Sequence, residues 1–205
     1  MFYPTLNAYI KQMVSEYDQI PSERKAVLAK ITDFIQSQQS EQAFANLNFI
    51  CTHNSRRSHL GAIWTKAAAE WHGIPKVQTF SGGTEATAFN PRAVAALERT
   101  GFSIQQTTWA DNPIYHIRFQ DEGPAMTAFS KVYNQAPNPL EGYCAVMTCS
   151  SADDACPVVF GASERIAVTY QDPKISDGMP EEAQTYDQRA LQIGREMFYA
   201  LSLVK

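Results

Sequence analysis

The stretch Ile-Cys-Thr-His-Asn-Ser-Arg-Arg-Ser at residues 50–58 gathers side chains that can attack and hold an anion. Cys51 offers a sulfur nucleophile. Arg57, six residues later, offers a planar fork of N–H groups that can grip two oxygens of a tetrahedral oxyanion. Ser58 could donate a hydrogen bond to the sulfur, and Asn54 could pin the loop by bonding its backbone. These residue types predict a nucleophilic thiolate beneath a bound oxyanion.

The flanking segments are expected to place this stretch at the end of a sheet. Residues 46–51 are typical of a buried strand, and residues 57–73 of a helix closed by Gly73. Ligands of parallel sheets bind beyond the carboxyl ends of strands, and the start of a helix attracts anions. The same positive field favours the thiolate form of Cys51. We therefore predict an oxyanion loop made of Thr52, His53, Asn54, Ser55, Arg56, Arg57 and Ser58.

The rest of the chain alternates strand and helix patterns. The further patterns are a strand at 76–83, a helix at 90–101, buried strands at 143–149 and 165–170, and a long helix at 180–204. Strand and helix in alternation indicate right-handed parallel crossovers. The predicted fold class is α/β, with a mostly parallel central sheet and helices on both faces.

Two segments extend this plan. Residues 1–45 carry two amphipathic helical patterns, which predict an N-terminal helical extension before a catalytic domain at 46–205. Three arrangements of the extension stay open: packing on the sheet, pairing two copies of the chain as a homodimer, or covering the site. Residues 102–120 predict an added β-hairpin that either extends the sheet or shapes the rim of the site. Residues 124–135 are expected to form a short helix.

Composition excludes several classes of function. The formal net charge is −4, which does not favour binding to nucleic acid or to an anionic membrane surface. No apolar run is long enough to span a membrane, and the first twenty residues do not have the pattern of a secretory signal. A cytoplasmic location is the expectation. In that compartment the four cysteines are not expected to form a static disulfide framework.

Cys51-Thr-x-Asn-Ser-x-Arg57-Ser after a short apolar strand resembles the phosphate loop of the low-molecular-weight protein tyrosine phosphatase superfamily. Residues 80–104 resemble the segment that follows the first helix in that superfamily, most of all in its branch of thioredoxin-coupled arsenate reductases. The resemblance covers roughly residues 47–104 and 143–203 and leaves out the N-terminal helices. It implies the phosphatase-like α/β fold, with Cys51 as nucleophile and Arg57 as oxyanion clamp.

The resemblance also implies a catalytic acid. In this superfamily an aspartate followed by proline on a late loop protonates the leaving oxygen of a phosphate ester. Asp172-Pro173 matches that pattern directly after the strand at 165–170. Asp-Pro is also a common turn dipeptide. The same aspartate occurs in the reductase branch, so Asp172 does not separate the two activities.

Cys149 and Cys156 do separate them. Their arrangement resembles the reductase branch, which implies that Cys149 attacks the sulfur of Cys51 and that Cys156 then resolves the disulfide. The residues between them are expected to be flexible. Buried structural cysteines and a zinc site are the alternatives, although the spacing is not that of a zinc knuckle and no metal is expected. Cys144 lies within a strand pattern and is expected in the core.

Two loop residues depart from the resemblance. His53 stands where relatives usually carry glycine, which would carry a cost if the backbone there had a positive φ. Arg56 stands where several relatives carry cysteine or a small residue. It could strengthen the attraction for anions or point to solvent.

The leading interpretation is an arsenate reductase that uses Cys51, Arg57, Cys149 and Cys156, with no bound cofactor and thioredoxin or a similar dithiol as electron donor. One alternative is a phosphatase for phosphotyrosine or a small phosphomonoester, using Cys51, Arg57 and Asp172. The other is a non-catalytic oxyanion or phosphoprotein binder.

Overall fold

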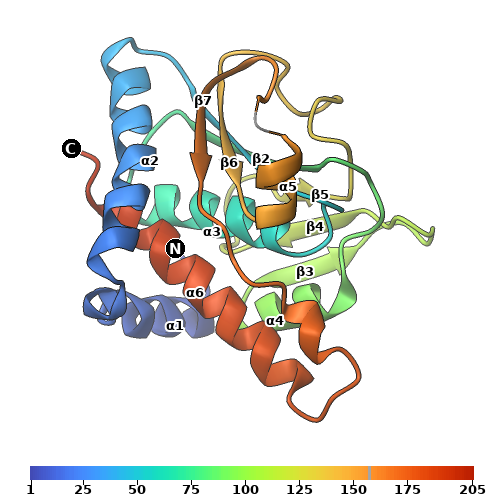
Figure 1. Cartoon of the computed structure of the whole chain (residues 1–205). Helices are drawn as coiled ribbons and strands as arrows, with labels where there is room; N and C mark the ends of the chain where they lie inside the picture. Colours follow the sequence, from blue (N-terminus) through green and yellow to red (C-terminus); the bar gives the residue numbers. More distant parts are fainter. Residues whose placement is uncertain (157) are drawn as a thin grey trace.

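The central sheet has four parallel strands in the order β2-β1-β6-β7. The computed structural model describes residues 1–156 and 158–205 (Figure 1). The strands of this sheet are β1 (Ala45–Cys51), β2 (Val77–Gly83), β6 (Tyr143–Met147) and β7 (Ala162–Ala167). Every residue of β6 and nearly every residue of β1 is buried, as expected for central strands of a parallel sheet.

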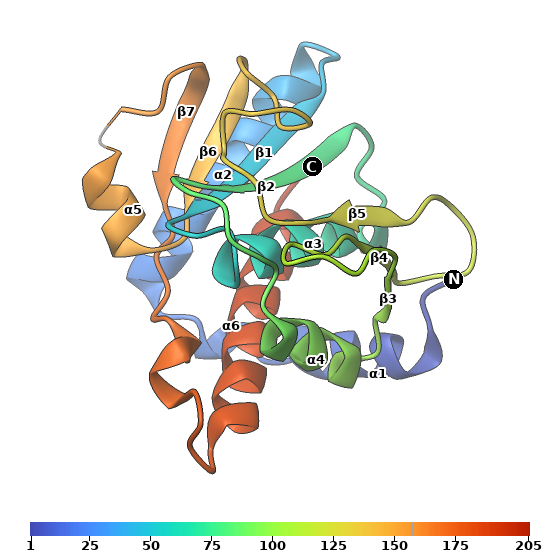
Figure 2. The ribbon, with the colours of Figure 1, turned by 90° about the vertical axis from the view of Figure 1, so that its right-hand side faces the viewer.

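Helices cover both faces of the sheet (Figures 1 and 2). The helices are α1 (Pro4–Val14), α2 (Ser22–Ser40), α3 (Arg57–Trp71), α4 (Pro91–Thr100), α5 (Ser150–Ala155) and α6 (Glu182–Ser202), with 3₁₀ turns η1 (Tyr17–Gln19) and η2 (Pro173–Ser176). Neighbouring side chains of a strand point to opposite faces. Leu47 and Val146 therefore join a large core with α2, α3 and α6, whereas Ile50 and Met147 join a small core beside α5. The predicted fold class is confirmed.

The N-terminal helices pack into the large core. Their buried side chains are Leu6, Ile10 and Met13 in α1 and Leu28, Ile31, Phe34 and Ile35 in α2. Both helices contact α6. At Gly194 of α6 a β-carbon would lie 2.9 Å from the sulfur of Met13 and 3.0 Å from the indole of Trp64. Glycine at this position therefore lets α1 and α3 approach α6 closely.

The predicted hairpin is part of a separate three-stranded antiparallel sheet. Its strands are β3 (Ser103–Gln106), β4 (Tyr115–Arg118) and β5 (Met126–Ala128), in the order β3-β4-β5. The expectation of a helix at 124–135 is wrong, because Met126 pairs with Ile117 in a strand. The following backbone is held by distant partners, including the side chain of Asn54, which accepts the N–H of Lys131 at 2.9 Å.

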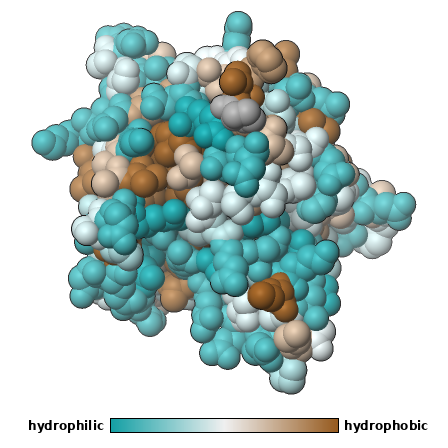
Figure 3. All heavy atoms as spheres, viewed as in Figure 1, coloured by the Kyte–Doolittle hydropathy of each residue, from teal (hydrophilic) through white to brown (hydrophobic). Residues whose placement is uncertain are grey.

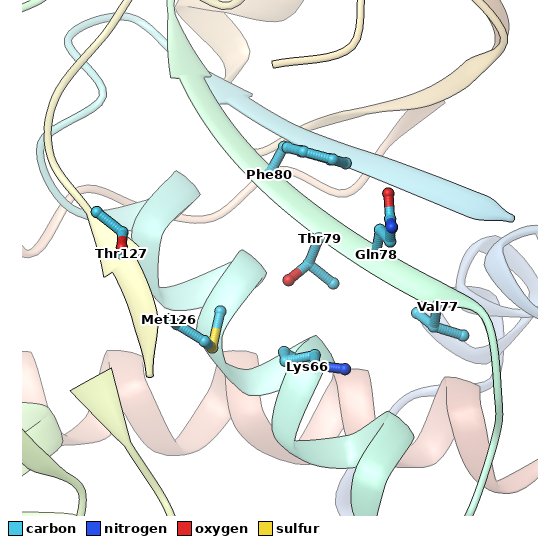
Figure 4. Close-up of a pocket in the computed structure, with 7 residues that line it drawn as sticks. All are labelled: Lys66, Val77, Gln78, Thr79, Phe80, Met126 and Thr127. Carbon is cyan, nitrogen blue, oxygen red and sulfur yellow. The ribbon is translucent and has the colours of Figure 1, made fainter. Parts of the chain in front are cut away.

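The added sheet lies beside the central sheet without extending it. A groove of about 320 Å³ separates edge strand β2 from β5 and is lined by Lys66, Val77, Gln78, Thr79, Phe80, Met126 and Thr127 (Figure 4). The added sheet contacts the anion loop through the turn between β3 and β4 and the segment after β5. Asn112, in the turn between β3 and β4, accepts the N–H of Ser130 at 3.1 Å, and the hydroxyl of Ser130 donates to the carbonyl of His53 at 3.0 Å.

The surface is mainly hydrophilic on the face seen in Figure 3, where hydrophobic side chains form small separate patches. Among the described residues, no helix combines the length and apolar character that crossing a membrane requires.

Candidate functional site

Cys51 is the last residue of β1 and is buried at the start of the loop that leads into α3. Its sulfur lies 3.1 Å from the hydroxyl oxygen of Ser58. That oxygen accepts a hydrogen bond from the amide of Asn54 at 2.8 Å, so the hydroxyl hydrogen is available to the sulfur. Asn54 is held in turn by the N–H of Lys131. The structure thus brings Cys51, Asn54 and Ser58 together, but the side chain of Asn54 bonds Ser58 and the backbone of the distant Lys131, whereas a bond to the loop backbone was expected.

The loop backbone turns at Asn54, whose φ is +43°. His53 is not among the residues with positive φ, so a side chain at that position does not strain the backbone. Asparagine tolerates the left-handed region better than most residues. The loop also packs on Gly83, where a β-carbon would lie 2.6 Å from both the nitrogen of Asn54 and the carbonyl oxygen of Thr52. Glycine at the end of β2 is therefore needed for the loop to close.

Arg57 is the first residue of α3, and its guanidinium contacts the segment that follows β7. One terminal nitrogen donates to the carbonyl of Tyr170 at 2.9 Å, and the other lies 2.5 Å from a carboxylate oxygen of Asp172. Its Nε is buried and has no hydrogen-bond partner among the described residues. This N–H is therefore free to bind an oxyanion in the loop.

Asp172 precedes η2 and accepts the N–H of Lys174 at 3.1 Å. Its carboxylate is about one third exposed, at 34%. The structure thus places Asp172 beside the anion loop, in contact with Arg57 and with access to solvent.

Arg56 neither lines the loop nor points to solvent. Its Nε donates to the hydroxyl of Tyr186 at 2.7 Å, and a terminal nitrogen lies 3.4 Å from Asp177. The hydroxyl of Tyr186 donates to the same carboxylate at 2.8 Å. Burial raises the pKa of Tyr186 to about 12, so it remains a hydrogen-bond donor at neutral pH. Arg56 thus joins the loop to the segment that carries Asp172.

His53 lies at the outer rim of the loop. Its Nε2 is 3.0 Å from a carboxylate oxygen of Glu85, and both side chains are about half exposed. The backbone carbonyl of His53 accepts hydrogen bonds from Thr87 at 3.1 Å and Ser130 at 3.0 Å. Ser55 is buried and its carbonyl accepts the N–H of Asn90 at 2.9 Å, at the start of α4.

Cys149 follows β6 and is buried in the same small core as Cys51. Its sulfur lies 3.5 Å from the hydroxyl of Thr52, the residue next to Cys51. It also accepts the N–H of Ala152 at 3.4 Å. Cys156 is half-buried and packs against this core.

The segment between the two cysteines forms the short helix α5, although its residues have no strong helical period. Cys144 lies in β6, where burial raises the pKa of its thiol, so it remains a core thiol. Among residues 1–156 and 158–205, no group of three or more His, Cys, Asp or Glu side chains is arranged to hold a metal ion.

Two buried titratable side chains adjoin the site: Lys131, which sequence reasoning missed, and His59, which falls on the helix after the loop and was not expected to be a ligand. Both are buried behind the anion loop. His59 stacks on Phe89 with ring centroids 4.1 Å apart, and burial and the charge of Lys131 hold its pKa well below the usual value. Burial lowers the pKa of Lys131 from 10.5 to about 8. No local pattern marks Lys131, because its neighbour at the loop, Asn54, is distant in the sequence.

Replacing Lys131 with methionine is expected to stabilise the protein at pH 7. The lowered pKa corresponds to about 3 kcal/mol against folding while Lys131 is charged in both states. As pH rises from about 8 towards 10.5, the unfolded chain binds more protons than the native protein, so wild type gains stability. Urea unfolding at pH 7 and pH 10 should show the advantage of K131M shrinking with pH. An equal difference at both pH values would contradict this expectation.

Sequence relatives of the chain are arsenate reductases. That of Halalkalibacterium halodurans is 28% identical over 136 residues, which cover 65% of this chain and 78% of the relative. That of Bacillus subtilis is 28% identical over 143 residues, which cover 69% of this chain and 83% of the relative. No protein-family model matches the chain.

Solved structures share the fold. A YwlE mutant from Bacillus subtilis matches with a TM-score of 0.53 and 16% identity, covering 77% of this chain and 97% of that protein. The low-molecular-weight protein tyrosine phosphatase from T. tengcongensis matches with a TM-score of 0.52 and 16% identity, covering 77% and 98%. The chain therefore has the fold of the low-molecular-weight protein tyrosine phosphatases. In sequence the chain is similar to arsenate reductases, and in fold it is similar to low-molecular-weight protein tyrosine phosphatases.

Proposed function

We propose that the protein reduces arsenate to arsenite with electrons from a thioredoxin-like dithiol. The observation that carries the proposal is the placement of Cys149 against the anion loop, 3.5 Å from the Thr52 hydroxyl, in one buried core with Cys51. Cys156 borders the same core. A phosphatase needs only one of these three thiols, whereas a two-electron reduction needs a pair.

The reaction begins when the thiolate of Cys51 attacks the arsenic of an arsenate held by Arg57 and the loop N–H groups. A sulfur–arsenic bond forms and one oxygen leaves as water after protonation. The thiolate of Cys149 then attacks the sulfur of Cys51. The sulfur–arsenic bond breaks with its electron pair passing to arsenic, which leaves as arsenite.

The product of that step is a Cys51–Cys149 disulfide. The thiolate of Cys156 attacks the sulfur of Cys149 and releases Cys51 as a thiolate. The external dithiol then reduces the Cys149–Cys156 disulfide and is itself oxidised. Such a donor is maintained in a reducing compartment, so we expect the protein to act in the cytoplasm without a bound cofactor.

Steady-state turnover of four proteins tests the proposal: wild type, Cys51→Ser, Cys149→Ser and Cys156→Ser. Each receives arsenate with thioredoxin, its reductase and NADPH. Each serine variant is expected to keep less than about 1% of the arsenate-dependent NADPH oxidation of wild type, because each removes a thiol that acts in sequence. Full arsenate turnover by Cys149→Ser or Cys156→Ser would refute the relay.

A phosphatase is the second candidate, because Asp172 lies where the acid that such an enzyme needs could act. This carboxylate lies beside the anion loop, 2.5 Å from Arg57, with solvent access. As a general acid it would protonate the leaving oxygen of a phosphomonoester while Cys51 forms a phosphocysteine. Hydrolysis of an aryl phosphate that requires Cys51 and Asp172 but neither Cys149 nor Cys156, with arsenate inert, would assign this function. Phosphate binding without either turnover would indicate a non-catalytic binder.

A further inference from the structure

Arg165, in β7, binds the backbone of α5 at two points: within the helix at Asp153 and just after its end at Cys156. Its Nε donates to the backbone carbonyl of Cys156 at 3.0 Å. A terminal nitrogen donates to the backbone carbonyl of Asp153 at 2.8 Å and pairs with the carboxylate of the same residue. The side chain is about one quarter exposed, and the reaction described above does not use it.

These bonds matter because α5 is short. A helix of six residues leaves its last carbonyls without intrahelical partners, and it is not stable on its own. An arginine that binds those carbonyls supplies the missing partners. The guanidinium of Arg165 therefore stabilises α5 in its helical form.

The helical form is incompatible with a bond between the two cysteines. Cys149 precedes α5 and Cys156 follows it, so seven residue steps of helix separate their α-carbons by roughly 10 Å. A disulfide requires α-carbons within about 7 Å. The sulfur of Cys149 is also bound to the N–H of Ala152 at 3.4 Å. Forming the disulfide must therefore unwind part of α5 and break at least some of the bonds to Arg165.

We infer that Arg165 is a positioning residue that holds the Cys149–Cys156 pair in its dithiol form and so raises the reduction potential of the pair. This inference rests on the proposed relay. With α5 intact, Cys149 stays against Thr52, beside Cys51, and Cys156 cannot reach it. When Cys156 attacks Cys149 in the Cys51–Cys149 disulfide, α5 opens, one disulfide replaces another, and Cys51 leaves as a thiolate. Reduction by the external dithiol lets α5 and its bonds to Arg165 re-form.

The test is a redox titration that needs no arsenate. The Cys149–Cys156 pair is equilibrated with reduced and oxidised dithiothreitol in the Cys51→Ser background, where oxidised dithiothreitol takes up the two electrons. Adding Arg165→Gln is expected to favour the disulfide about tenfold, which moves the midpoint about 30 mV more negative. Arg165→Lys should give an intermediate shift, because an ammonium cannot bind both carbonyls as a planar fork does. Arg99→Gln, which removes an exposed arginine pair with Asp187, is the matched control and should leave the midpoint unchanged.

Amide hydrogen exchange of the reduced protein gives a second readout. Arg165→Gln is expected to speed the exchange of α5 amides about tenfold while those of α6 stay protected, which also shows that the variant is folded. If Arg165→Gln and Arg99→Gln share one midpoint, if α5 exchange does not change, or if no Cys149–Cys156 disulfide forms, the inference is overturned. If the midpoint and exchange shift as expected but the wild-type protein does not reduce arsenate, the proposed function fails and the role of Arg165 stands.

Discussion

Replacing Arg57 with alanine should lower kcat/KM about a thousandfold for whichever oxyanion substrate the enzyme turns over. The variant loses the buried Nε donor, which has no hydrogen-bond partner among the described residues, together with the charge of the guanidinium. Arg57→Lys should recover little, because an ammonium does not provide the planar pair of donors. The measurement is kcat/KM for arsenate and for an aryl phosphate.

Arg56→Gln is the matched control for that prediction. Both arginines are 11% exposed and adjacent in sequence, yet the guanidinium of Arg56 is bonded to Tyr186 and Asp177. Its loss should lower the melting temperature and reduce kcat/KM by less than about tenfold, because it removes no donor from the anion loop. Equal losses for the two variants would show that Arg57 acts by holding the loop in place and does not bind the oxyanion.

The anion loop could be predicted because its residues are consecutive. Cys51, Asn54, Arg57 and Ser58 lie within eight positions, between a strand and a helix whose patterns are both strong. The end of β1 and the start of α3 then fix the positions of these residues. The neighbours supplied by distant segments could not be predicted in the same way. Lys131 reaches Asn54 only because the segment after β5 folds back onto the loop.

The wrong prediction of a helix at 124–135 and the unpredicted helix α5 have a common cause. Residues 124–135 were expected to form a short helix, but pairing with β4 places residues 126–128 in a strand. In the opposite sense, residues 150–155 have no helical period, yet the capping contact of Cys149 and the bonds from Arg165 stabilise a helix. In both segments, tertiary partners override weak local preference.

Arg24→Met should destabilise the protein by about 3–5 kcal/mol, because it leaves the carboxylate of Glu196 buried without its cation. Arg24 lies in α2 and donates to Glu196 of α6 at 2.8 Å, and its guanidinium also lies 4.7 Å from the ring centre of Tyr170. Glu196 is only 3% exposed. Urea unfolding, with the slope held constant between proteins, measures the change in the free energy of unfolding.

The double variant Arg24→Met, Glu196→Met separates the pair from the packing around it. Replacing both charges with apolar side chains removes the stranded carboxylate, so most of the lost stability should return. Arg99→Met, which breaks the exposed pair with Asp187, should cost no more than about 1 kcal/mol. A cost that small for Arg24→Met would mean that water reaches Glu196. The expected large cost would mean that the buried carboxylate of Glu196 in α6 requires Arg24 of α2. Residues 1–45, although outside the resemblance to the phosphatase superfamily, would then fold as one cooperative unit with α6.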